Sequence, residues 1–202
     1  PTRRSSDLLL KHLDPVPISR QREGLEVINS QAKNLTAFLD SYHRLTHLPE
    51  PEYKMVTIQA LFTKLERLLQ AEPGSERIVY SGGKAGKSTD KELQIYGDVN
   101  LVTLALINLI RNALQAVEGQ RDGIVRVDAY AGATGRLFIT ITDNGPGIPP
   151  ERLSAVFTPF YSTKSGGSGI GLPISQRIMQ LHGGQLSVLS IQNVRTTFKM
   201  EF

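Results

Sequence analysis

The chain has 202 residues, 40% hydrophobic side chains, a formal charge of +4 and no cysteine. This length and apolar content suffice for one α/β core with a helical appendage. Disulfides and thiolate metal sites are excluded, and a cytoplasmic location fits, with a parent protein free to be anchored in the inner membrane. Lysines and arginines form no basic stripe and no run of about 18 apolar residues exists, so we expect neither nucleic-acid binding nor membrane contact from this chain.

The N-terminal part predicts one long helix. Residues 1–18 fit no regular element, since Pro15 and Pro17 interrupt them, and are expected to be irregular or disordered. Residues 19–51 predict a helix and a linker, because proline at 49 and 51 ends helical structure. The apolar residues are spaced alternately three and four apart, which is the seam of a coiled coil that needs partner helices. They are Leu25, Ile28, Ala32, Leu35, Leu39 and Tyr42.

Residues 52–202 predict a second domain, which begins with mixed short elements. We expect strands at Met55–Ile58, Arg77–Tyr80 and Glu92–Tyr96 and a helix at Ala60–Leu69. The segment Ser81–Ser88 nearly matches a P-loop, but its first required glycine is a serine and a strand follows it rather than a helix. We therefore predict a flexible hairpin between the second and third of these strands.

The next helix carries two asparagines. From Asp98 to Val117 apolar residues recur at every third or fourth position, with Asp98 placed to cap the helix and Gly119 to end it. Asn108 and Asn112 lie four residues apart and project from one face, where their amide oxygens suit a hard cation such as Mg2+. The alternative is that both are polar residues of a solvated stripe.

A predicted strand at Leu137–Thr142 ends in Asp143-Asn-Gly-Pro-Gly-Ile-Pro. A carboxylate at a strand end can accept a hydrogen bond from an exocyclic amine such as that of adenine. The glycines beside it allow a flat ring to approach the backbone. The alternative is ordinary turn chemistry, which this composition also favours.

A glycine-rich loop, Gly166–Gly171, leads into a further predicted helix. Such a loop offers free backbone N–H groups and the positive end of a helix dipole to a phosphate. The preceding residues, Phe157–Lys164, do not predict the buried strand that a Rossmann unit requires. They predict the root of a flap anchored by Phe157 and Phe160, with Lys164 able to reach a phosphate. The alternative for Lys164 is a solvated lysine.

Taken together, four segments resemble the nucleotide-binding boxes of a known family. They are Asn108-Leu-Ile-Arg-Asn-Ala-Leu-Gln-Ala116, Asp143-Asn-Gly-Pro-Gly147, Phe157-Thr-Pro-Phe-Tyr-Ser-Thr-Lys164 and Gly167-Ser-Gly-Ile-Gly-Leu172. In order and separation they resemble the N box, first glycine box, F box and second glycine box of sensor histidine kinases, the kinase branch of the gyrase, chaperone and mismatch-repair ATPase superfamily. The resemblance spans roughly residues 54–202. It implies an α+β fold, a two-layer α/β sandwich whose mixed sheet is covered by about three helices, preceded by a long coiled-coil-type helix.

The resemblance also implies ATP and Mg2+ as cofactors. Asn108 and Asn112 are expected to hold the metal and, with Lys164 near the phosphates, to act in catalysis. Asp143 is expected to contact the adenine amine. The other expected nucleotide-binding residues are Gly145, Gly147, Ile148, Ser168, Gly169, Gly171, Leu172 and, from the last strand, Thr197.

The histidines lack the context of a phosphoacceptor. In the resembled family this histidine lies on the first hairpin helix, followed by an acidic residue and shortly by a proline. None of His12, His43, His47 and His182 has this setting. We therefore expect a fragment whose acceptor belongs to sequence before Pro1.

The implied function is that of the ATP-binding catalytic portion of a two-component sensor histidine kinase. Its γ-phosphate would pass to a histidine on a dimerisation helix absent from this chain, and then to an aspartate of a response regulator receiver domain. The N-terminal helix would be the second hairpin helix of a homodimer. One alternative is a nucleotide-gated switch or scaffold without phosphotransfer, and another is an ATPase of the same superfamily. Against hydrolysis, Asn108 stands where a glutamate base is needed, and an amide cannot accept the proton.

Overall fold

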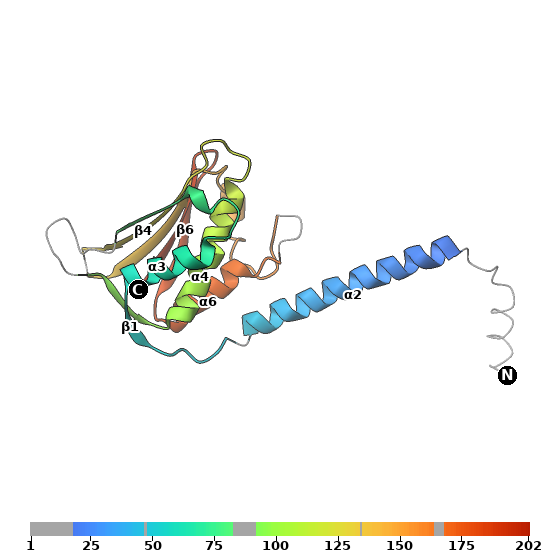
Figure 1. Ribbon diagram of the computed structural model, residues 1–202, viewed down its shortest axis with the longest axis horizontal. Helices are drawn as coiled ribbons and strands as arrows, with labels where there is room; N and C mark the ends of the chain where they lie inside the picture. The colour runs from blue at the N-terminus through green and yellow to red at the C-terminus, as the bar shows by residue number, and fades with distance from the viewer. Residues whose placement is uncertain (1–17, 47, 83–91, 134, 164–167) are drawn as a thin grey trace. The chain divides into compact units, whose positions relative to one another are not determined.

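The computed structural model describes residues 18–46, 48–82, 92–133, 135–163 and 168–202 (Figure 1). The chain divides into two compact units, Pro1–His43 and Arg44–Phe202. The division falls near the end of the first helix, whereas the sequence places the domain boundary after residue 51.

Helix α2 (Ile18–Thr46) is the long helix that the heptad spacing predicts. Its apolar seam is not covered within the first unit, because Leu25 and Ile28 are each 66% exposed and Leu35 is 60% exposed. An exposed stripe of this kind is typical of a helix that packs against other helices in an assembly.

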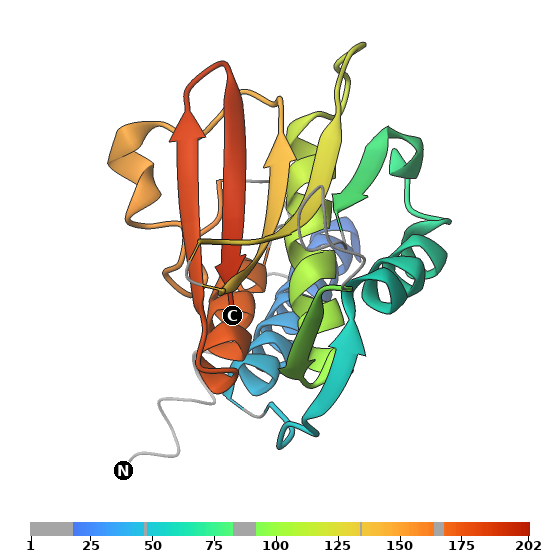
Figure 2. The ribbon, with the colours of Figure 1, turned by 90° about the vertical axis from the view of Figure 1, so that its left-hand side faces the viewer.

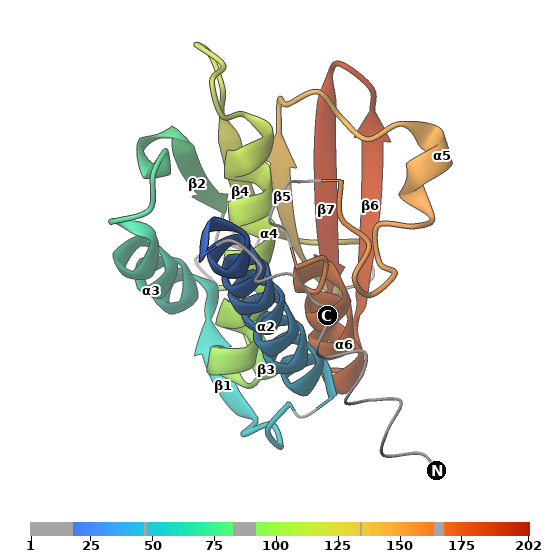
Figure 3. The same ribbon diagram turned by 90° about the vertical axis from the view of Figure 1, so that its right-hand side faces the viewer.

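The second unit is built on a five-stranded mixed sheet. Its strand order is β2-β4-β5-β7-β6, with β2 and β4 parallel and every other neighbouring pair antiparallel (Figure 3). A separate antiparallel pair joins β1 to β3. The strands are β1 (Lys54–Thr57), β2 (Ile78–Gly82), β3 (Gln94–Gly97), β4 (Val125–Ala131), β5 (Leu137–Asp143), β6 (Gln185–Ile191) and β7 (Arg195–Glu201).

Three helices cover one face of this sheet (Figure 1). The opposite face, seen in Figure 2, carries none of them. The predicted two-layer α+β architecture is therefore confirmed. The helices are α3 (Ile58–Leu69), α4 (Val99–Ala116) and α6 (Gly171–Leu181), with the shorter α5 (Pro150–Leu153) and the 3-10 turn η1 (Ser75–Arg77) outside this layer.

The core lies between the helices and the sheet, and α4 is its centre. Leu106, Leu109 and Ile110 on α4 are fully buried, as are Ile139 and Ile141, which alternate along β5. The helix therefore follows the 3.6-residue period and the strand the period of two, each with its apolar side turned to the same core.

The predicted hairpin between the second and third strands is wrong. Strand β2 pairs in parallel with β4, whereas β3 pairs with β1, so the two belong to different sheets. A parallel pair requires a crossover connection, and here β3 and α4 provide it between β2 and β4. Residues 83–91, which hold most of the P-loop-like segment, lie outside the described part of the chain.

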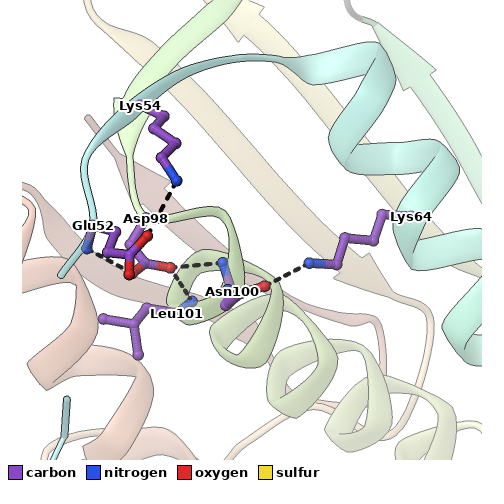
Figure 4. A network of polar contacts seen from close by, with 6 residues as sticks. All are labelled: Glu52, Lys54, Lys64, Asp98, Asn100 and Leu101. Carbon is purple, nitrogen blue, oxygen red and sulfur yellow. Dashed lines mark hydrogen bonds and ion pairs between the residues drawn. The ribbon is translucent and has the colours of Figure 1, made fainter. Parts of the chain in front are cut away.

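A polar network fastens the first turn of α4 to the start of the unit (Figure 4). The Asp98 carboxylate accepts hydrogen bonds from the backbone N–H groups of Asn100 at 2.8 Å and Leu101 at 3.1 Å, which is the predicted helix cap. It also accepts one from the N–H of Glu52 at 2.8 Å. Lys64 of α3 donates to the Asn100 side chain at 2.8 Å.

The electrostatics of this network favour an ionised Asp98. Burial raises the pKa of its carboxyl, but the N–H groups of Glu52, Leu101 and Asn100, with His182 nearby, outweigh burial and hold the pKa below its ordinary value. His182 completes the junction, because its Nε2 accepts from the Asp98 N–H at 2.9 Å while its Nδ1 lies 2.7 Å from the Ile178 carbonyl oxygen.

By length and composition alone, one helix among the described residues would be able to cross a membrane. It is α4, and half of that stretch is buried inside the unit. The helix is the core element of the sandwich.

Candidate functional site

A stripe of polar residues on α4 forms one wall of a pocket of about 600 Å³. Asn108, Arg111, Asn112 and Gln115 all line it. Their spacing of three, one and three residues places them on one face of the helix. The Asn108 amide lies beside the start of α6 and donates to the Gly171 carbonyl oxygen over a long 3.4 Å.

The turn after β5 forms the floor. Asp143 is only 2% exposed, and its Oδ1 accepts a hydrogen bond from the Gly145 N–H at 3.0 Å. Asn144 ties the turn to the start of β4, since its side chain accepts from the Ile124 N–H at 2.8 Å and donates to the Asp122 carbonyl at 2.9 Å. The carboxylate is thereby held in a hydrogen-bonded turn that lines the pocket.

The two glycines of this turn are needed for contacts within the protein. A Cβ on Gly145 would lie 2.9 Å from the Ala116 carbonyl oxygen, and Gly145 is not among the pocket-lining residues. Gly147 does line the pocket, yet with φ +71° its Cβ would lie 2.5 Å from the Ile191 carbonyl oxygen. Both positions therefore exclude a side chain because backbone packs there.

The β6–β7 hairpin holds this turn in place. The Ile148 N–H donates to the Ser190 Oγ at 2.7 Å, and the Asn193 N–H donates to the Pro146 carbonyl at 2.7 Å. The first glycine box is thus supported from a hairpin more than 40 residues later in the chain.

A backbone hydrogen bond joins Phe160 of the F box to Gly169 of the second glycine box. The Phe160 N–H donates to the Gly169 carbonyl at 3.0 Å, and Gly169 adopts φ +66° with no room for a Cβ beside Phe160. Phe157 packs against the core as expected of an anchor. Phe160 is 39% exposed, and its backbone N–H forms the hydrogen bond to Gly169. Lys164 lies outside the described residues.

The last strand contributes Thr196 to the pocket, and not the expected Thr197. Thr196, Phe198 and Met200 alternate on the core side of β7 and are buried. Thr197 points to the other face of the sheet, where its hydroxyl lies 3.0 Å from that of Thr142. The expectation for Thr197 is therefore corrected by one residue, which in a strand means the opposite face.

Most of the expected site residues meet in this one pocket. Gly145 and Thr197 do not line it, and Lys164 is not described. The expected residues that line it are Asn108, Asn112, Asp143, Gly147, Ile148, Ser168, Gly169, Gly171 and Leu172.

The side-chain amide oxygens of Asn108 and Asn112 on α4 suit a Mg2+ ion that is also bound by phosphate oxygens. Asn112 is half-buried, and its side chain makes no hydrogen bond within the described residues. In the same part of the chain no group of three histidine, cysteine, aspartate or glutamate side chains is placed to hold a metal. Two neutral amide oxygens supply hard ligands without charge, so phosphate and water oxygens would have to complete the coordination.

Among the pocket and supporting residues that the sequence does not predict, Arg111, Thr196 and Ser190 differ in the sequence signal that they leave. Arg111 was within reach of prediction, because it lies three residues after Asn108 on the same stripe. Thr196 was too, because it continues the alternation of Phe198 and Met200. Ser190 had no local signal, since it acts through a contact with a distant turn.

A helix-covered mixed sheet, with a pocket between a helix stripe, a glycine turn and a glycine loop, is the architecture of a nucleotide-binding domain. The family described as histidine kinase-, DNA gyrase B- and HSP90-like ATPases matches residues 97–202. This match covers more than half of the chain, and the chain belongs to that family, whose members use ATP.

Relatives and solved structures agree with this assignment. The sensor histidine kinase ZraS of Salmonella typhimurium is 41% identical over 105 residues, covering 52% of this chain and 22% of the relative. The signal transduction histidine-protein kinase AtoS of Escherichia coli K12 is 27% identical over 188 residues, covering 93% and 29%. The catalytic domain of histidine kinase ThkA is similar in structure, with a TM-score of 0.61, 25% identity and coverage of 75% of this chain and 95% of that domain. The chain thus spans less than a third of ZraS and AtoS.

Proposed function

We propose that this chain is the ATP-binding catalytic portion of a two-component sensor histidine kinase. The observation that carries the proposal is the convergence of four sequence boxes on one pocket that has amide donors on one wall and a buried carboxylate on another. The family assignment and the similarity to named histidine kinases support the same activity.

Each wall has a distinct role in this proposal. The Asp143 carboxylate accepts from the exocyclic amine of adenine, with Ile148 and Thr196 beside the base. Asn108 and Asn112 supply oxygens to Mg2+, which neutralises phosphate charge when bound. Ser168 and Gly169 lie against the phosphates, together with the N-terminus of α6 at Gly171.

The proposed reaction moves the γ-phosphoryl group of ATP to a histidine imidazole nitrogen. A nitrogen–phosphorus bond forms, the bond from the γ-phosphorus to the bridging oxygen breaks, ADP leaves and the imidazole loses its proton. The residues of this chain position the nucleotide and offset its charge, as is general for phosphoryl transfer. His182 is not the acceptor, because one ring nitrogen accepts from the Asp98 N–H and the other faces the Ile178 carbonyl.

The proposal extends to partners and location. The exposed seam of α2 forms the homodimer contact of a dimerisation hairpin. The phosphohistidine then passes its phosphoryl group to a response regulator receiver domain. The catalytic unit works in the cytoplasm, with the parent protein in the inner membrane as a further part of the proposal.

The experiment has two measurements. Calorimetry should show Mg2+-dependent binding of ATP to this chain. Incubation with γ-labelled ATP should then label a version with a first hairpin helix, carrying an acidic-flanked histidine, fused before Ile18. The label should be acid-labile and base-stable, and the unfused chain should remain unlabelled.

Three results would contradict the proposal or a part of it. Absence of ATP binding in both proteins would refute the nucleotide site itself. Binding without transfer in the fused protein would favour the alternative of a nucleotide-gated switch. Labelling of the unfused chain at His12, His43, His47 or His182 would show that the acceptor had been misidentified.

A further inference from the structure

Arg111, one of the polar residues of α4 that line the pocket, forms an ion pair with Glu72. The Arg111 Nη2 lies 2.9 Å from the Glu72 Oε2. The arginine side chain is 53% exposed and the glutamate 27% exposed. Arg111 also lines the pocket, between Asn108 and Asn112 along the helix. The guanidinium therefore lies within reach of two regions, the carboxylate of Glu72 and the space beside the two amides.

Glu72 has the less exposed side chain of the two, 27% against 53%. It follows α3 in a tight turn, in which its N–H donates to the Leu69 carbonyl at 2.9 Å and its own carbonyl accepts from the Ser75 N–H at 3.1 Å. Arg111 has a long side chain on a helix and can change rotamer while the backbone stays fixed. The arginine is thus the partner able to move.

The charges around the pocket make Arg111 useful to a phosphate. Among the described lining residues the charged side chains are Arg111, Arg152 and Asp143. In the function proposed above, Asp143 faces the base and the amides are neutral, so the arginines are the described cations available to a triphosphate. A guanidinium pairs with phosphate as it does with carboxylate, through the same fork of donors.

We propose that Arg111 is a phosphate-binding residue of the nucleotide site and that Glu72 competes with the phosphate for it. In the free protein the Glu72 carboxylate occupies the guanidinium. When a nucleoside triphosphate binds, the guanidinium exchanges the carboxylate for a phosphate oxygen, so affinity reflects the difference between the two pairings. The inference rests on the proposed function, since it requires a nucleotide in this pocket.

The test is a double-mutant cycle read with nucleotides of different phosphate content. Calorimetry with ATP, ADP and adenosine, in the presence of Mg2+, is carried out on the wild-type chain, Arg111→Gln, Glu72→Gln and the double variant. Arg111→Gln should weaken ATP about tenfold and leave adenosine unchanged, as expected for one charge-assisted hydrogen bond. Glu72→Gln should tighten ATP about threefold, because no carboxylate competes.

The cycle contains its own controls. In the Arg111→Gln background, Glu72→Gln should have no effect on ATP, because the two effects share one guanidinium. Arg111→Lys should restore part of the lost affinity through its charge. Arg126→Gln, an exposed arginine on β4, removes the same charge away from the pocket and corrects for the general field of the protein.

The outcomes separate this inference from the function on which it rests. Equal loss of ATP and adenosine affinity in Arg111→Gln would overturn it, as would an ATP affinity that Glu72→Gln leaves unchanged or lowers. If the wild-type chain binds none of the three compounds, the proposed function fails first. Thermal unfolding should be nearly the same for all variants, since an exposed ion pair contributes little to stability.

Discussion

The two ends of helix α4 use polar side chains in opposite ways. At its start, the Asp98 carboxylate is 6% exposed and accepts three backbone N–H groups within 3.1 Å. Toward its end, the half-buried Asn108 makes one long hydrogen bond of 3.4 Å, and the Asn112 side chain makes none among the described residues. Both ends carry polar side chains inside a packed unit. We call the first end saturated, because the protein itself supplies hydrogen-bond partners to both carboxylate oxygens of Asp98, and the second end unsaturated.

This difference separates structure from function within one element. A half-buried polar side chain that lacks a protein partner needs water or a ligand to complete its hydrogen bonds or coordination. The saturated end of α4 joins segments from different parts of the chain and secures the helix. The unsaturated end faces the pocket, where a ligand can supply the partners. Mutations at the two ends should therefore change different measurements.

Asp98→Ala should have the largest effect, and it should be on stability. The variant loses the helix cap and leaves the Glu52 N–H without its acceptor, so the free energy of unfolding should fall by about 3 kcal/mol. Urea unfolding followed by circular dichroism measures this. Asp122→Ala, at an exposed loop position, is the matched control.

The comparison also predicts what Asp98→Ala leaves unchanged. At a temperature where the variant is folded, its affinity for Mg-ATP should remain within about twofold of wild type, since the pocket lies at the other end of the helix. A large loss of affinity with unchanged stability would reverse the assignment of the two ends.

Asn112→Ala should show the converse pattern. Removal of one of the two amides proposed to hold Mg2+ should weaken Mg-ATP binding by about 100-fold, while the unfolding midpoint stays near the wild-type value. Asn100→Ala makes the same chemical change at the saturated end, where it removes only the exposed contact with Lys64. Calorimetry in the presence of Mg2+ should therefore separate the two variants, and equal affinities would contradict the metal assignment.

The sequence alone predicts the saturated end only in part and the pocket end well. The cap by Asp98 follows from local spacing, and so does the shared face of Asn108 and Asn112, because helical period is a local property. The contact of Glu52 with Asp98 spans 46 positions, and that of Ile148 with Ser190 spans 42. Neither has a local signal, because each arises only when distant segments pack.

The remaining differences between the predicted and the observed structure concern which strands pair and which face of a strand a residue lies on. The sequence predicts β2 and β3 as a hairpin because they are neighbours in the chain, but the crossover through α4 takes the next strand to β2 instead. The resemblance assigns Thr197 to the pocket, although the buried alternation of Phe198 and Met200 assigns that side to Thr196. A shift of one residue changes the face of a strand, so residue roles carried over by resemblance need the alternation as a check.

Asp143→Asn should alter base selectivity at the floor of the pocket. GTP has a carbonyl oxygen where ATP has an amine, so with Asp143 two acceptors would face each other. The wild-type chain should bind ATP at least about tenfold more tightly than GTP, the scale of one charge-assisted hydrogen bond. The amide of the variant can also donate, so the ratio should fall toward one. If competition measurements showed no preference for ATP over GTP in the wild-type chain, Asp143 would not recognise the adenine amine and would serve only the structure of the turn.

The smallest expected effect is the pH dependence of the saturated end. The N–H groups around Asp98 lower the pKa of its carboxyl in the folded chain, although burial acts in the opposite direction. Its contribution to stability is therefore fully present above the ordinary aspartate pKa, about 3.9, and is lost as the pH falls through the folded value. Urea midpoints of the wild type and Asp98→Asn should be measured from pH 7 down to about 3. The difference between them cancels the titration of the other carboxylates, which both proteins share. The stability advantage of the wild type should be constant at neutral pH and shrink below about pH 4, whereas an advantage that grows on acidification would mean that the carboxyl is held protonated in the network.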